Sequence, residues 1–180
     1  LAVQQGDWTG ARESFAKASR VIDDFPPVWR ARFGAAHAEA ALQTGDIEAA
    51  RALIAYALSQ DLPASEQLSV RLVQAHLFQL QGQTDRALAV YKAVGRAPLD
   101  QVAVPARLEA VRIELARKTL SPVEAAKQLE GLRWRWRGDA TELEVIRTLS
   151  ELYMSQGMYR EALTALRSAG SRLSRLPGAA

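Results

Sequence analysis

The residues that could carry out chemistry in this sequence are few, and their spacing forms no catalytic pattern. The two histidines, His37 and His76, lie in stretches of apolar or small residues, "GAAHAEAAL" and "LVQAHLFQL". Neither has a second histidine or a carboxylate at metal-ligand spacing, because Glu39, two residues from His37, diverges from it on a helix. Both histidines are therefore predicted to be structural.

The common sequence signatures of enzymes are absent as well. The sequence has no GxSxG, Walker-type loop, dinucleotide fingerprint or HExxH. Asp23 and Asp24 lie in "DDFPP", which suits a helix end better than acid–base catalysis. The chain has no cysteine, which removes disulfides, thiolate metal sites and a cysteine nucleophile. We therefore predict a protein that is not an enzyme and needs no cofactor or metal.

A stretch rich in tryptophan and arginine, "LEGLRWRWRGD" at residues 129–139, is the strongest candidate for binding chemistry. The sequence "SPVE" at residues 121–124 is a helix start, in which serine caps and glutamate completes a capping box. With Gly138 as its stop, the stretch is predicted to end a helix rather than form a strand. Helical spacing then places Trp136 with the core and Trp134 on the opposite side.

Three interpretations of Trp134 remain open. The side chain packs on an adjoining hairpin, anchors a protein interface beside the arginines, or stacks on a nucleic-acid base. Residues 91–180 carry 15 Lys/Arg against 10 Asp/Glu, whereas residues 1–90 carry 8 against 10. This basic half is either a solvated face or a surface for an acidic partner. One tryptophan and so modest a charge make nucleic acid the least favoured partner.

The elements that position these residues follow a repeated spacing. Each of four turns has a glycine, then an alanine after five residues, a bulky residue after nine, and a small or β-branched residue after twelve. The glycines are Gly6, Gly45, Gly82 and Gly157, and the alanines are Ala11, Ala50, Ala87 and Ala162. The bulky residues are Phe15, Ile54, Tyr91 and Leu166, and the small or β-branched residues are Ala18, Ala57, Val94 and Ala169. Glycine permits the left-handed backbone that ends a helix, and alanine lets two helices approach closely.

A fifth turn, "TLSPVEAAKQLE", completes the series. Ser121 takes the glycine position and Ala126 follows five residues later, while Glu130 and Arg133 take the bulky and small positions. Intervals between the five turns are then 39, 37, 39 and 36 residues. A period of this length, built from paired helices, is typical of a solenoid.

These residues resemble the tetratricopeptide repeat (TPR) family. The clearest match is "LSELYMSQGMYREALTALRSA", with Leu149, Tyr153, Gly157, Tyr159, Ala162 and Ala169 in the expected order. The resemblance covers nearly the whole chain as about four and a half degenerate repeats, spaced more widely than the family's usual length of about 34 residues. It implies an all-α fold, a right-handed superhelical α-solenoid of antiparallel helix hairpins with nine to ten helices.

The predicted array is a single domain over residues 1–180. Its repeats are 1–27 (partial), 28–63, 64–99, 100–138 (divergent) and 139–176. The predicted helices cover residues 7–20, 28–43, 46–59, 65–81, 83–95, 101–118, 122–137, 140–156 and 158–173, with a partial one at 1–5.

In the TPR family the first helix of each hairpin lines a concave groove that holds an extended peptide or a partner's helix. The groove positions that the resemblance implies in the second repeat are Arg32, Ala35, Glu39, Leu42 and Gln43, and those in the third are Leu72, His76 and Gln79. In the fourth repeat they are Val111, Arg112, Leu115 and Lys118, and in the fifth Glu144, Arg147, Glu151 and Met154. Trp134 joins them as a candidate partner-binding residue. The sequence contains no asparagine, so the family's lysine–asparagine clamp for a chaperone's C-terminal carboxylate is not expected.

The resemblance thus implies a noncatalytic interaction scaffold that binds a protein or peptide. A structural self-assembly module of a larger bacterial complex and a nucleic-acid-binding helical repeat are the alternatives. Arginine outnumbers lysine 19 to 4, which suggests a GC-rich bacterial genome, and Leu1 falls within a predicted helix, which suggests a fragment of a longer protein. No run approaches the roughly 20 apolar residues of a membrane span. The compartment, cytoplasmic or periplasmic, stays open.

Overall fold

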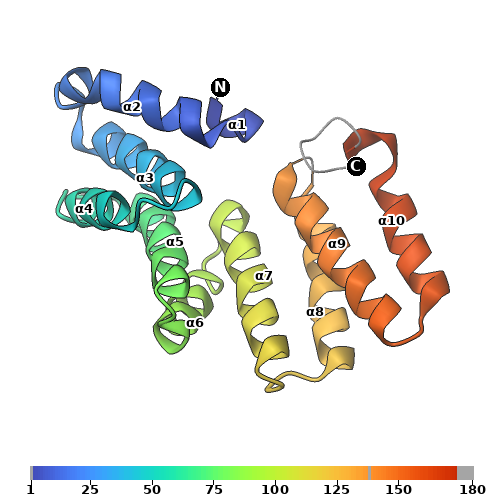
Figure 1. The fold of residues 1–180 in the computed structure, drawn as a ribbon. Helices are drawn as coiled ribbons and strands as arrows, with labels where there is room; N and C mark the ends of the chain where they lie inside the picture. Colours follow the sequence, from blue (N-terminus) through green and yellow to red (C-terminus); the bar gives the residue numbers. More distant parts are fainter. Residues whose placement is uncertain (1, 138, 174–180) are drawn as a thin grey trace. The chain divides into compact units, whose positions relative to one another are not determined.

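The protein is α-helical throughout the part of the chain that the structure describes. The computed structural model describes residues 2–137 and 139–173, and none of these lies in a strand. Its helices (Figure 1) are α1 (Ala2–Gln5), α2 (Trp8–Ile22), α3 (Pro27–Gln43), α4 (Ile47–Leu58), α5 (Ala64–Leu80), α6 (Thr84–Val94), α7 (Asp100–Ala116), α8 (Pro122–Arg135), α9 (Ala140–Ser155) and α10 (Tyr159–Leu173). The prediction of an all-α fold is confirmed, and the predicted helix ends lie within two residues of those observed.

The helices form two compact units, Leu1–Val94 and Gly95–Ala180. In the first unit, α3 packs against α2, α4 and α5, and α5 also packs against α4 and α6. In the second unit, α9 packs against α7, α8 and α10, and α7 packs against α8. Within each unit, successive hairpins therefore meet through their first helices, α3 with α5 and α7 with α9. The second helix of one hairpin also packs against the first helix of the next.

At four of the predicted turns, the preceding helix ends just before a glycine whose backbone is left-handed. Gly45 has a φ of +81°, and the chain then enters α4 through Asp46, whose side chain accepts a hydrogen bond from the Ala49 amide. Only glycine adopts such a φ without a steric penalty, so the turn fixes the residue type. The same conformation is found at the other predicted glycines, Gly6, Gly82 and Gly157.

The turn between α7 and α8 differs from the prediction. Lys118, not Ser121, has the left-handed backbone, with a φ of +57°, and Ser121 instead caps α8. In the turn before α4 the cap Asp46 directly follows the glycine, and buried Ala50 comes four residues after the cap. Ser121 is the equivalent of that cap, so buried Ala125 and Leu129 take the alanine and bulky positions, one residue earlier than predicted. The assignment of repeat positions in this turn to Ser121, Ala126, Glu130 and Arg133 is therefore wrong.

Each unit has a buried cluster in which branched side chains of successive hairpins meet. In the first unit, Ile54 of α4 lies in a buried cluster with Val70 and Val73 of α5. In the second unit, Leu129 of α8 lies in a corresponding cluster with Val145 of α9. Ile54 and Leu129 each follow a buried alanine by four residues, one helical turn, and share their clusters with residues of the first helix of the next hairpin.

Candidate partner-binding surfaces

Polar residues on α3 and α5 pair with each other across the boundary between two hairpins. Nε of Arg32 donates to Oε2 of Glu66 at 3.0 Å, and the Arg32 guanidinium lies 5.0 Å from the ring centroid of Trp29. Further along the helices, Nδ1 of His76 lies 2.9 Å from Oε2 of Glu39. Each of these two pairs joins α3 to α5. Together they include the predicted groove residues Arg32, Glu39 and His76, whereas Glu66 was not predicted.

The Glu39–His76 pair is partly buried, and its surroundings favour the charged carboxylate. Burial acts to raise the pKa of Glu39, but the hydrogen bond and charge of His76 and a 2.9 Å hydrogen bond from Gln43 lower that pKa overall. Gln79 of the same predicted set accepts a 2.7 Å hydrogen bond from the Tyr91 hydroxyl. These polar side chains therefore stabilise the first unit as well as lining its surface.

Arg112 of α7 occupies the equivalent place in the second unit. Its guanidinium donates to Glu109 at 2.7 Å on its own helix, and to Glu144 at 2.6 Å and Thr148 at 2.8 Å on α9. Burial opposes the charged form, yet the hydrogen bonds and charges of Glu144 and Glu109 raise the pKa of Arg112 overall. Arg112 therefore acts as a bridge between α7 and α9.

Three of the other predicted groove positions do not reach the surface. Ala35, Leu42 and Val111 are buried, so their assignment to a partner-binding surface is wrong. Lys118 is exposed and lies in the turn after α7. Leu72 and Leu115 are half-buried. Of the predicted positions on α9, Arg147, Glu151 and Met154 are exposed.

Trp134 lies near the end of α8 with 63% of its surface exposed. The guanidinium groups of Arg133 and Arg137 lie 5.0 and 4.8 Å from its ring centroid, within cation–π distance. Arg133 is held in place by Glu130 at 2.7 Å. The interpretation in which Trp134 packs on an adjoining hairpin is therefore wrong. The ring is exposed to solvent, and Arg133 beside it is fixed by its ion pair with Glu130.

The rest of the Trp/Arg stretch is structural. Trp136 is partly buried against the core cluster of the second unit, as predicted, and Arg135 binds Asp100 of α7 at 2.6 Å. The helix ends at Arg135, because Trp136 has extended backbone angles of −130° and 133°, so the predicted end at 137 is two residues too late. The predicted stop, Gly138, lies outside the described residues.

The sequence prediction that the histidines are structural agrees with their contacts, although their partners were missed. His37 stacks on Phe15 of α2 with ring centroids 5.3 Å apart, and burial, with the nearby charge of Arg12, lowers the pKa of His37. His76 and Glu39 are 37 residues apart, the same interval that separates the turn glycines Gly45 and Gly82. That interval is the signal in the sequence that could have revealed the pair, since it places both residues at the same position of adjacent hairpins.

Comparisons with known proteins give no match: no family model, no curated protein and no solved structure is similar to this chain. Among the described residues, no three His, Cys, Asp or Glu side chains gather as metal ligands would. The described helices also include none with the length and apolar character to span a bilayer.

Proposed function

We propose that this chain is a TPR-like helical repeat array that acts as a noncatalytic scaffold and binds a partner protein through the surface around Trp134. The observation that carries the proposal is the exposure of Trp134 beneath two guanidinium groups. Large exposed aromatic residues flanked by arginine are the side chains that contribute most to protein interfaces. The repeated left-handed turns and the packing of successive first helices support the repeat array.

The preorganisation of Trp134 favours a protein partner. Arg133 is nearly buried and bound to Glu130, so its guanidinium limits the movement of the indole ring before any partner arrives. Binding then orders few additional side chains, which lowers its entropic cost. Arg137 is exposed at the other contact of the ring and is available to a carboxylate of the partner.

The exposed face of α9 is a second part of the proposed surface. Arg147, Glu151 and Met154 are spaced by four and three residues and so share one side of the helix. Nε of Arg147 lies 3.4 Å from Glu151, an exposed pair that a partner can replace at little cost. This face offers a charged and an apolar contact to an extended peptide, as the family resemblance implies for first helices.

Nucleic acid fits these contacts less well. Arg112, Arg133 and Arg135 each bind a carboxylate of the same chain, so they are partly neutralised before meeting a phosphate. A nucleic-acid-binding array predicts an affinity that falls steeply with salt concentration. We expect no saturable binding of single-stranded RNA or DNA at low salt in a filter-binding assay.

Affinity capture with matched variants tests the proposal. Wild type, Trp134→Ala and Val123→Ala are used as baits in a lysate of the source cells, with capture read by mass spectrometry. Val123 is exposed on the same helix and serves as the control. We expect a partner retained by wild type and Val123→Ala but lost with Trp134→Ala, since a hot-spot residue contributes about 2 kcal/mol or more. Identical partner lists from all three baits contradict the proposal.

A further inference from the structure

We infer that the outer face of α10 is a docking surface for an amphipathic helix edged with acidic residues. Three apolar side chains are exposed along this face: Tyr159 is 67%, Leu163 53% and Leu166 46% accessible. Their spacing of four and three residues places them in one stripe. Met158, also exposed, directly precedes the helix. This surface is distinct from the one around Trp134, and the two proposals stand or fall separately.

Comparison among the hairpins shows what kind of element fits the stripe. Leu166 follows the buried Ala162 by four residues, the position occupied by Ile54 in α4 and by Leu129 in α8. Ile54 and Leu129 are 2% and 0% exposed, and each lies in a buried cluster to which the first helix of the next hairpin, α5 or α9, contributes residues. In both hairpins a helix of the following hairpin thus contributes to the cluster that buries this position. A helix is therefore the element that fits Leu166.

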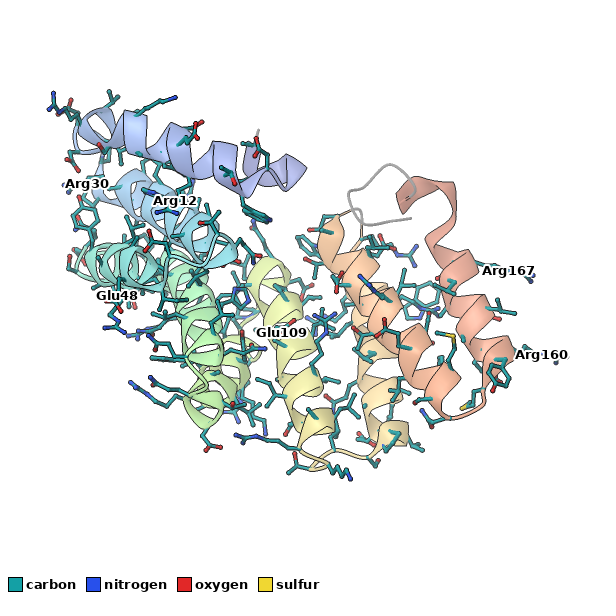
Figure 2. The ribbon with its side chains drawn as sticks, viewed as in Figure 1. Arg12, Arg30, Glu48, Glu109, Arg160 and Arg167 are labelled. Carbon is teal, nitrogen blue, oxygen red and sulfur yellow. The ribbon has the colours of Figure 1, made fainter. Side chains whose placement is uncertain are left out.

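The charges beside the stripe indicate the chemistry of that helix. Arg160 and Arg167 project from α10 on the side away from α9 (Figure 2), and their spacing of seven residues places them two turns apart on one side. Neither forms an ion pair within the described part of the chain. A partner helix with carboxylates two turns apart complements them. A second copy docked through the same face would bring arginine against arginine, so charge favours a different, acidic helix.

The chain itself contains a suitable probe. Helix α9 packs with the equivalent leucine, Leu129, in the buried cluster of the second unit, and it carries Glu144 and Glu151 seven residues apart. A synthetic peptide of residues 140–155 therefore has the apolar stripe and the acidic spacing that α10 calls for. Its binding to the whole chain can be followed by the fluorescence anisotropy of an attached dye.

We expect saturable binding of this peptide to the wild-type chain. Leu163→Lys with Leu166→Lys should weaken it by ~tenfold or more, because each removes an apolar contact. Val123→Lys on α8 is the control and should bind as wild type does. Circular dichroism should be unchanged in all of these variants, since the replaced side chains are exposed.

Charge exchange separates specific docking from nonspecific adhesion. A peptide with Glu144→Lys and Glu151→Lys should bind the wild-type chain poorly, and should bind an Arg160→Glu, Arg167→Glu chain better than the unaltered peptide does. Trp134→Ala should leave peptide binding unchanged. The inference is overturned by absence of saturable binding, by equal binding to the Leu163/Leu166 variant, by lack of the charge rescue, or by a dimer of the chain that this variant abolishes.

Discussion

Replacing Arg112 by methionine is expected to destabilise the second unit by about 2 kcal/mol. Methionine keeps much of the apolar stem, so the change removes mainly the guanidinium and its hydrogen bonds to Glu109, Glu144 and Thr148. Hydrogen bonds to charged groups contribute about 1.5–3 kcal/mol each when buried. Because a third of the Arg112 side chain is exposed and the three contacts are not independent, we expect about the value of one such bond.

Arg147 provides the matched comparison. It also contacts Glu144, at 3.7 Å, and Glu151, but both partners lie on its own helix and its side chain is 60% exposed. An exposed pair of this kind contributes about 0.3–0.5 kcal/mol, so Arg147→Met is expected to cost no more than that. The difference between the two variants isolates the bridge between α7 and α9 from the effect of losing a positive charge.

Urea denaturation of both variants, followed by circular dichroism and tryptophan fluorescence, measures the two free energies of unfolding. A double-mutant cycle between Arg112→Met and Thr148→Val adds a check, because a bridge predicts a coupling energy of about 1 kcal/mol. If Arg112→Met unfolds at the same urea concentration as Arg147→Met, Arg112 does not hold α7 and α9 together, and the description of this network is wrong.

Three further predictions concern a turn, the core and a partly buried histidine. Lys118→Gly should raise the free energy of unfolding by about 1 kcal/mol in urea denaturation, because Lys118 has a left-handed backbone that glycine adopts without strain. Leu129→Ala should cost about 3 kcal/mol, whereas Leu166→Ala at the equivalent position should cost less than about 1 kcal/mol, since only Leu129 is covered; equal losses in thermal melts would refute the equivalence. NMR titration should place the pKa of His37 below its ordinary value of about 6.5, because burial disfavours the imidazolium. A lowered pKa means that stability present above pH 6.5 is lost as the pH falls toward the folded-state pKa, and His37→Gln should abolish that slope.

The helices could be predicted from the sequence because their ends are marked by local chemistry. Gly45 and Asp46 specify the turn before α4 within two adjacent residues, and Ser121 with Glu124 does the same for the start of α8. Such signals depend only on neighbouring residues. The all-helical fold follows from them without any knowledge of the packing between helices.

The candidate site was less predictable, because it depends on contacts between helices. Helical periodicity placed Trp134 on the side of α8 away from the core. It could not show whether another hairpin packs against that side of the helix. Arg112 was correctly placed on a first helix, yet its contact with Thr148, 36 residues away, depends on the distance between α7 and α9. The error of one residue in α8 arose because a lysine replaces glycine at the left-handed position, which removed the marker on which the register relied.

Photo-crosslinking at position 134 tests most directly the claim that the surface around Trp134 binds a partner protein. A photoreactive phenylalanine analogue is placed at position 134 in one chain and at position 123 in another, and each chain is irradiated in a lysate of the source cells. The proposal predicts a discrete crosslinked protein at position 134 that is missing at position 123. No adduct at position 134, or the same adducts at both positions, would contradict it.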